Sequence, residues 1–248
     1  MSVLLSGDFH ANAMGELSII TKKNLVDKYG IKTFRSINYH IILGDAGFLW
    51  PGNGRSDLYH YKTLAYRPFP ILCVIGNHEP MLGMKLPEKD IGIGETVYLV
   101  NEKPLVAYLK RGKIYNIDGF KFLSLGGALS IDQEYRIPQL SWWPNEYWSA
   151  AEESDLFSLL KNDNNFDYVI SHTGPDSINY KLFSSMFAGS DKFTDKVAQL
   201  NDTIDLRIKC KSWFCGHWHQ DRVYHDDDKK RSYHYLYSDV ELLDHKDF

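Results

Sequence analysis

Five short apolar segments recur along the chain, and each is followed at once by a polar cluster. They are residues 3–6, 40–43, 71–75, 168–171 and 212–215. All five are rich in β-branched or aromatic residues, and none alternates strictly between apolar and polar positions. Short runs of this kind are typical of strands that are covered on both faces. The pattern therefore predicts five buried strands.

Stretches with the apolar spacing of helices lie between these predicted strands. The four candidate helices are residues 14–29, 57–66, 150–161 and 193–208. In the first of them, Leu17, Ile20 and Leu25 lie near one face. Strands that alternate with helices early in the chain are typical of βαβ units, in which consecutive strands run parallel.

The pattern changes between residues 96 and 125. This part of the chain contains four strand-like runs, TVYLV, LVAYL, KIYNI and FKFLSL, separated by the turn signals NEKP, KRG and DG. We expect antiparallel hairpins here that form or extend a second sheet. Two more strands are expected at residues 222–225 and 232–243, on either side of a charged turn. The elements together predict an α/β chain with two sheets and outer helices.

Composition limits the class of protein. The chain has 248 residues, of which 44% are hydrophobic and 24% charged, so we expect a single globular domain over residues 1–248. The formal net charge of -4 argues against a protein that coats nucleic acid through its backbone. A nuclease stays possible, because bound metal ions can supply positive charge at the site.

Cysteine usage and the absence of apolar spans indicate the compartment. Cys73, Cys210 and Cys215 form no CxxC pair, which favours a reduced, cytoplasmic setting. The N-terminal residues lack a basic region and a cleavage-like segment, so we interpret them as a strand rather than a signal peptide. No apolar stretch approaches the roughly 20 residues that a membrane span needs, and no membrane association is expected.

The polar clusters behind the five predicted strands carry residue types that bind divalent cations. In layered α/β folds, the loops at the carboxyl ends of the strands converge on one site. The metal-binding types in these loops are Asp8, His10, Asp45, Asn77, His172, His217 and His219. Two pairs among them are spaced by two residues, which places both side chains on one side of an extended segment.

Each of these clusters also has an ordinary explanation. An isolated Asp-x-His is usually a cap or a surface turn, Gly-Asp after a strand is often only turn chemistry, and a histidine at a strand end is commonly just hydrogen-bonded. Five such clusters in succession, each directly behind a predicted strand, favour a metal site over these explanations.

The series GDFH, GDAG, GNHE, SHTGP and GHWH resembles the calcineurin-like metallophosphoesterase superfamily over most of the chain. The resemblance implies a four-layer α-β-β-α sandwich of two mixed sheets flanked by helices. It also implies that Asp45 bridges two metal ions and that His78 is a catalytic residue that binds neither. The first ion would be held by Asp8, His10 and His219, and the second by Asn77, His172 and His217. The segments GGALSIDQEYR and WWPNE are similar to small bacterial and phage members and indicate no substrate.

The implied activity is hydrolysis of a phosphodiester or phosphomonoester by a hydroxide that bridges two divalent ions. We expect Mn²⁺, with Fe²⁺, Zn²⁺ or Ni²⁺ as alternatives, because the ligands are carboxylate, amide and imidazole groups without a thiolate. His78 would protonate the leaving oxygen or stabilise charge there. The substrate (nucleotide, nucleic acid or phosphoprotein) and the oligomeric state stay open.

One departure from the resemblance bears on the substrate. Phosphoprotein phosphatases of the superfamily continue the second motif with an Asp-Arg-Gly element, whereas this chain has Phe48 and Leu49 there. A phosphoprotein phosphatase is therefore disfavoured, and Glu79 or Asp132 is left to orient His78. A catalytically weak metal-binding scaffold is a further alternative, which the presence of His78 disfavours.

Substrate contacts are less clearly marked than the metal ligands. Arg136 is the first choice for binding phosphate, with Arg111 behind it. The tryptophan-rich residues 135–148 form either an aromatic wall for substrate or ordinary packing, and we favour packing. Trp50 and Trp218, which lie beside the ligand motifs, could also line the site.

Overall fold

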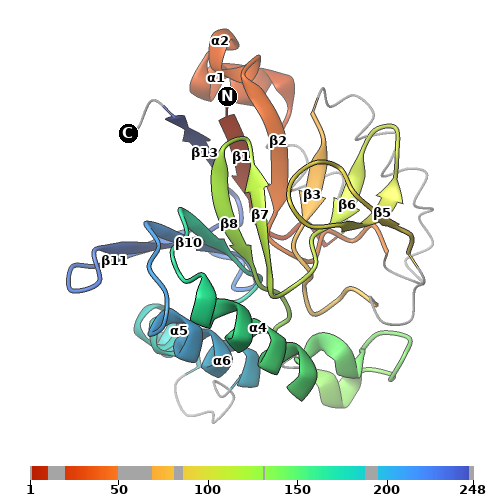
Figure 1. The fold of residues 1–248 in the computed structure, drawn as a ribbon, viewed down its shortest axis with the longest axis vertical. Helices are drawn as coiled ribbons and strands as arrows, with labels where there is room; N and C mark the ends of the chain where they lie inside the picture. The colour runs from red at the N-terminus through yellow and green to blue at the C-terminus, as the bar shows by residue number, and fades with distance from the viewer. Residues whose placement is uncertain are drawn as a thin grey trace.

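Two mixed β-sheets with helices on their outer faces form the molecule. The structure is a computed structural model that describes residues 2–10, 20–49, 69–80, 86–130, 132–187 and 195–245. Figure 1 shows α1 and α2 at one end of the molecule and α4, α5 and α6 gathered at the other. This confirms the expected sandwich of two mixed sheets with flanking helices.

The first sheet has seven strands in the order β13-β1-β2-β3-β6-β5-β4. Its central strands β1, β2, β3 and β6 run parallel, while β13, β5 and β4 pair antiparallel at the two edges. The bounds are β1 (Ser2–Ser6), β2 (Ile37–Ile42), β3 (Ile71–Cys73), β4 (Glu88–Lys89), β5 (Val97–Asn101), β6 (Val106–Tyr108) and β13 (Val240–Asp244).

The second sheet has six strands in the order β11-β12-β10-β9-β8-β7. Here β8, β9, β10 and β12 run parallel, and β7 and β11 are antiparallel edge strands. The bounds are β7 (Lys113–Ile117), β8 (Phe120–Ser124), β9 (Tyr168–Ile170), β10 (Ser212–Cys215), β11 (Arg222–Asp226) and β12 (Arg231–Tyr235).

The described helices are short. The α-helices are α1 (Lys22–Tyr29), α2 (Ile31–Phe34), α4 (Ala150–Asn162), α5 (Asp176–Phe183) and α6 (Lys196–Asp205). Three 3₁₀ turns complete them: η2 (Gln133–Tyr135), η3 (Pro144–Glu146) and η4 (Ser184–Phe187). No helix in the described part of the chain is both long enough and apolar enough to cross a membrane.

Successive side chains of the central strands enter different layers of the core. Leu4 faces the outer layer that contains Leu25 of α1, whereas Val3 and Leu5 face the layer between the two sheets. A third apolar layer joins the second sheet to α4, α5 and α6. Both faces of the central strands are therefore buried, which explains why their sequences are almost continuously apolar.

The five predicted strands are confirmed as β1, β2, β3, β9 and β10. Two other strand predictions were wrong in part. The run at 96–109 gives β5 and β6, which extend the first sheet because β6 pairs with β3; only β7 and β8 join the second. The single strand expected at 232–243 is two strands in different sheets. The carboxylate of Asp221 accepts the backbone N–H groups of residues 237, 238 and 239, which fixes the break between them.

Three of the predicted helices are present, but each differs from its predicted bounds at one or both ends. The helix at 150–161 is confirmed as α4, one residue longer. In the described part of 14–29, the helix begins only at Lys22, because Thr21 caps it by accepting the N–H of Asn24. In the described part of 193–208, Asp195 caps α6, which ends at Asp205. The candidate at 57–66 lies outside the described residues, and α5 was not predicted.

Candidate metal centre

The predicted ligands come together where the parallel strands of both sheets end. β1, β2 and β3 of the first sheet lead into Asp8, Asp45 and Asn77. β9 and β10 of the second sheet lead into His172 and His217. Residues far apart in sequence therefore meet at one edge of the sandwich, as expected for loops behind parallel strands.

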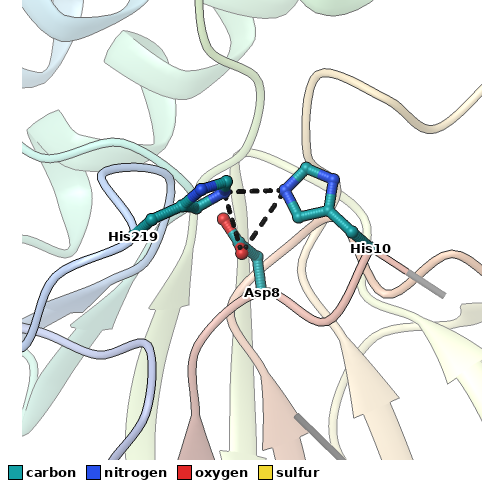
Figure 2. Close-up of side chains that lie close together, drawn as sticks. All are labelled: Asp8, His10 and His219. Atoms are coloured by element: carbon teal, nitrogen blue, oxygen red, sulfur yellow. Dashed lines mark hydrogen bonds and ion pairs between the residues drawn. The ribbon is translucent and has the colours of Figure 1, made fainter. Parts of the chain in front are cut away.

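Asp8, His10 and His219 form one group of side chains. Figure 2 shows both imidazoles turned toward each other and toward Asp8. Their Nε2 atoms are 2.8 Å apart and lie 3.5 and 3.3 Å from Asp8 Oδ1. That oxygen is buried and accepts no hydrogen bond in the described structure. A buried carboxylate oxygen facing two close ring nitrogens fits a divalent cation, whose charge would satisfy all three lone pairs.

Asp45 lies at the centre of the site. Its Oδ2 is 3.8, 3.6 and 3.3 Å from Nε2 of His10, His78 and His172, and its Oδ1 accepts the backbone N–H of His78 at 2.9 Å. Burial raises the pKa of this carboxyl, but the positive potential of His172 and His78 outweighs burial and holds the pKa well below its ordinary value. Asp45 is therefore charged, and that charge faces histidines from both sheets.

His172 and Asn77 form a second group beside Asp45. Nδ1 of His172 lies 2.8 Å from the carbonyl oxygen of Leu43, to which it donates, so Nε2 is the nitrogen left for a proton or a cation. This Nε2 lies 2.9 Å from Asn77 Oδ1. Burial lowers the pKa of His172, but Asp45 raises it to about 9. A positive charge at this position is thus stabilised, whether a proton or a cation supplies it.

His217 joins the same group through backbone and ring. Its backbone N–H donates to Asp8 Oδ2 at 3.0 Å, and its ring centroid lies 4.9 Å from that of His172. Burial and then the charge of His172 lower the pKa of His217 to about 3. A neutral imidazole with a free lone pair is the form that binds a metal.

The loops reach this arrangement with unusual backbone angles. His10, Asp45, His217 and His219 have φ values of 43°, 46°, 67° and 50°. Non-glycine residues are uncommon in this region, and their clustering is typical of functional sites. The expectation that the Asp8/His10 and His217/His219 pairs share a side of an extended segment was therefore wrong. Left-handed turns, not extended backbone, bring the side chains inward.

The side chain of Arg136 contacts the His78 ring, whereas the sequence suggested Glu79 or Asp132. Nη1 of Arg136 lies 2.5 Å from its Nδ1, and Nη2 lies 3.2 Å from its Nε2. Asp132 accepts a hydrogen bond from Nε of Arg136 at 2.7 Å, so it acts through the arginine. Burial lowers the pKa of His78, and with Arg136 alongside, the pKa is about 4 despite Asp45.

Glu79, the other residue suggested to orient His78, accepts hydrogen bonds from backbone N–H groups. Its buried carboxylate accepts the N–H of Gly76 at 2.6 Å and that of Asp45 at 3.2 Å, and it lies 3.3 Å from the hydroxyl of Tyr108. Burial, followed by the charge of Asp45, raises the pKa of Glu79 to about 7. Glu79 thus ties the loop of Asp45 to the loop of Asn77.

A cavity of about 450 Å³ opens beside these residues. It is lined by His10, Asp45, Asn77, His78, Leu129, Ser130, Asp132, Arg136, Met186, His217, Trp218, His219 and Gln220. Arg136 and Asp132 supply charge, whereas Leu129, Met186 and Trp218 supply apolar surface. The cavity is large enough for a small phosphoester with an apolar portion.

The residues suggested for substrate binding differ in whether they line the cavity. Arg136 and Trp218 line the cavity, but Arg111 is occupied by Glu152, with Nε–Oε1 and Nη2–Oε2 distances of 2.7 and 3.0 Å. In the segment 135–148, Trp143 and Trp148 are buried, which agrees with packing rather than a substrate wall. Phe48 and Leu49 are buried in the core, and Trp50 lies outside the described residues.

Two buried residues near the site were missed in the sequence. Ser130 accepts a hydrogen bond from Asn77 Nδ2 at 2.9 Å and donates to Glu146 at 2.6 Å. They belong to the segments GGALSID and WWPNE, whose resemblance to small bacterial and phage proteins was the only signal. The resemblance indicated the two segments but not that Ser130 and Glu146 form hydrogen bonds beside Asn77.

A model of the calcineurin-like phosphoesterase family matches residues 1–221. The chain belongs to this family. It is a metal-dependent phosphoester hydrolase, and the His and Asp groups described above provide places for the metal. No curated protein matches the sequence.

Solved structures that resemble the chain share its fold at low sequence identity. GAP50, the anchor in the inner membrane complex of Plasmodium, is 10% identical with a TM-score of 0.50, over 96% of this chain and 71% of that one. A protein described as a 5′-nucleotidase of Staphylococcus aureus is 11% identical with a TM-score of 0.51, over 97% of this chain and 50% of that one. These likenesses support the fold.

We predict that Gly76→Ala displaces Asp45. A Cβ at Gly76 would lie 2.0 Å from Asp45 Oδ1 and 2.5 Å from its backbone nitrogen. We expect the free energy of unfolding to fall by about 1–3 kcal/mol and the bound metal, measured by elemental analysis, to fall with it. The control is Gly30→Ala, where φ is +83° and a Cβ meets nothing within 4 Å. It should cost about 1–2 kcal/mol with normal metal content. Equal metal content in both variants would contradict the prediction.

Proposed function

We propose that this protein uses two divalent cations to hydrolyse small phosphodiesters or phosphomonoesters. The observation that carries the proposal is the environment of Asp45. Its buried Oδ2 lies within 3.8 Å of ring nitrogens of His10, His78 and His172. A carboxylate between two groups of nitrogen ligands can accept one cation on each side, which is the requirement for a bridging ligand.

The ligand assignment follows the two groups of side chains. Asp8, His10 and His219 would hold the first cation, which is supported by the oxygen of Asp8 that lacks a hydrogen bond in the described structure. Asn77, His172 and His217 would hold the second, and Asp45 would be shared. The hydrogen bond from His172 to the Leu43 carbonyl supports this assignment, because it directs the lone pair of Nε2 inward.

His78 is proposed as a catalytic residue and not as a ligand. It forms a possible metal-binding group with His10 and Asp45, but the guanidinium of Arg136 already approaches both of its ring nitrogens. A cation bound to the same ring would face that positive charge. A guanidinium only donates, so its shorter contact to Nδ1 favours the tautomer with the ring proton on Nε2, which would stabilise negative charge on a leaving oxygen by a hydrogen bond.

The nature of the ligands supports Mn²⁺, with Fe²⁺, Zn²⁺ and Ni²⁺ as alternatives. All the proposed ligands are carboxylate, amide or imidazole groups, and none is a thiolate. When bound, the two ions would supply positive charge to the phosphate and lower the pKa of a coordinated water. Arg136, which lines the cavity, would bind a phosphate oxygen, and Asp132 would hold its guanidinium in place.

The cavity supports a small substrate over a phosphoprotein. Charged Arg136 lies with His78 in the same cavity as Leu129, Met186 and Trp218. Such a lining suits a phosphoester that carries an apolar or planar group. A phosphoprotein phosphatase and a metal-binding scaffold without catalysis are the alternatives.

A reducing, cytoplasmic location is part of the same proposal. Cys73, Cys210 and Cys215 are free thiols, and Cys73 and Cys215 are buried. Burial raises the pKa of Cys210 to about 12, which keeps it as an unreactive thiol. Free buried thiols without a disulfide are typical of proteins in reducing compartments.

The experiment that tests the function compares a bis-aryl phosphate with an aryl monophosphate, each with Mn²⁺, Co²⁺ or Ni²⁺. We expect metal-dependent turnover that a chelator abolishes. Faster cleavage of the diester would favour nucleotide-like substrates, and a preference for the monoester would favour a phosphatase. Absence of turnover with every metal would sink the proposal and favour the scaffold.

Substitutions at Asp45 and His78 should separate metal binding from catalysis. Asp45→Asn removes the shared charge, so we expect metal content and activity to fall together. His78→Ala should leave metal content near normal and slow turnover by about 10²–10⁴-fold, the usual contribution of an acid–base group. Metal analysis and initial rates measure both. The exposed residues Asp27 and His225 provide matched controls, Asp27→Asn and His225→Ala. Two ions retained in Asp45→Asn would show that Asp45 is not the bridge.

Replacing Arg136 should weaken catalysis without loss of metal. Arg136→Lys keeps the charge but loses the fork that contacts Asp132 and His78. We expect kcat/KM to fall by about ten- to a hundredfold, the effect of losing one charged hydrogen bond. Arg207→Lys, at an exposed arginine, is the matched control. Unchanged kinetics in Arg136→Lys would remove Arg136 from the site.

A further inference from the structure

The side chain of Asn77 has two ends of similar shape but opposite chemistry. Its amide oxygen can bind a cation, whereas its NH₂ group can only donate hydrogen bonds. A rotation of the amide by half a turn would present the wrong end to the site. The structure has Oδ1 directed at His172, 2.9 Å from Nε2, and Nδ2 directed away at Ser130. Without a metal, a protonated Nε2 of His172 can donate to Oδ1 and hold the amide in this orientation. A cation would take the place of that proton, so a second group is needed to accept from Nδ2.

Ser130 can enforce it only if its own proton is committed elsewhere. A hydroxyl has one proton, and a serine that kept it toward Asn77 would attract the amide oxygen instead of the nitrogen. Glu146 accepts that proton, with an Oγ–Oε2 distance of 2.6 Å, and its other oxygen accepts the backbone N–H of Ser130 at 3.3 Å. The hydroxyl therefore presents only a lone pair to Asn77. All three side chains are buried.

The segment that carries Glu146 is itself fixed from two sides. Arg111 donates to the carbonyl oxygens of residues 145 and 147, at 3.0 Å each, and Glu152 holds its guanidinium. On the other side Gly127, at φ +84°, packs so closely that a Cβ would lie 2.1 Å from the carbonyl oxygen of Glu146. The position of Glu146 is thus set independently of Asn77.

We propose that Glu146 and Ser130 are positioning residues that select the metal-binding orientation of the Asn77 amide. The proposal rests on the proposed function, in which Asn77 is a ligand of the second cation. It assigns a role to the two sequence segments that the ligand set left unexplained. Glu146 commits the proton of Ser130, Ser130 accepts from Nδ2, and Oδ1 remains available to the cation.

The test is a titration of the metal-free protein with Mn²⁺, followed by calorimetry, for wild type, Ser130→Ala and Glu146→Gln. We expect Ser130→Ala to weaken binding of one ion by about 10–100-fold, the usual effect of losing a partner of a metal ligand, and to leave the other ion unchanged. Glu146→Gln should have a smaller effect in the same direction, because its amide can still accept one of the two hydrogen bonds. If Ser130→Ala fails to fold, as judged by circular dichroism, Glu146→Gln carries the test.

Ser124→Ala is the matched control. Ser124 is fully buried, and its hydroxyl has no hydrogen-bond partner in the described structure. The substitution removes the same atom from the interior without touching Asn77. We expect both ions to bind as in wild type.

The decisive measurement repeats Ser130→Ala in an Asn77→Asp background. A carboxylate presents an oxygen in either orientation, so no selection is needed there. The second carboxylate oxygen would face the lone pair of Ser130, so we expect Ser130→Ala in this background to leave metal affinity unchanged or to raise it. The same fold-loss in both backgrounds would mean that Ser130 acts only through general packing, and the inference would be overturned.

The outcomes also separate this inference from the proposed function. A wild-type protein that binds fewer than two ions would overturn the proposed function, and this inference with it. A wild-type protein that binds two ions, together with unaltered affinities in both Ser130→Ala and Glu146→Gln, would overturn this inference alone.

Discussion

The buried carboxylate of Asp45 is the group on which the site depends. A carboxylate without solvent requires opposite charge or hydrogen bonds, and here imidazoles and a backbone N–H supply both. Its histidine partners come from both sheets: His10 follows β1 in the first, and His172 follows β9 in the second. The interaction therefore joins the two halves of the sandwich at the edge where their parallel strands end. Cations in the proposed positions would satisfy the same charge.

Close backbone approach makes that interaction possible. Gly76 lies against Asp45 and Gly44 against His172, where a Cβ would come within 2.2 Å of Nδ1. Glu79 then ties the two loops together by accepting backbone N–H groups from Asp45 and Gly76. The loops that carry the proposed ligands are consequently held by buried hydrogen bonds and not by their own conformational preference, which four residues with positive φ oppose.

Position in space, not position in sequence, decides which residues support His78. The chain has Phe48 and Leu49 where related phosphatases have Asp and Arg, and both pack into the core. Arg136, from the segment after β8, contacts the imidazole instead, and Asp132 holds its guanidinium. The same segment contributes Ser130 to Asn77. One stretch of chain thus contacts both residues of the Asn-His motif.

The sequence by itself determined the five central strands, helix α4 and the identities of the residues that converge, because burial on both faces and ligand chemistry leave local patterns. It could not determine which sheet β6 or β13 joins, because strand pairing depends on segments far away in the chain. It also misjudged the conformation of His10 and His217, whose φ is positive and whose backbone N–H groups donate to the distant residues Asp45 and Asp8. Only the tertiary structure paired Arg136 with His78 and Ser130 with Asn77. Hydrogen bonds between distant loops have no periodic signature, so folding alone brings such partners together.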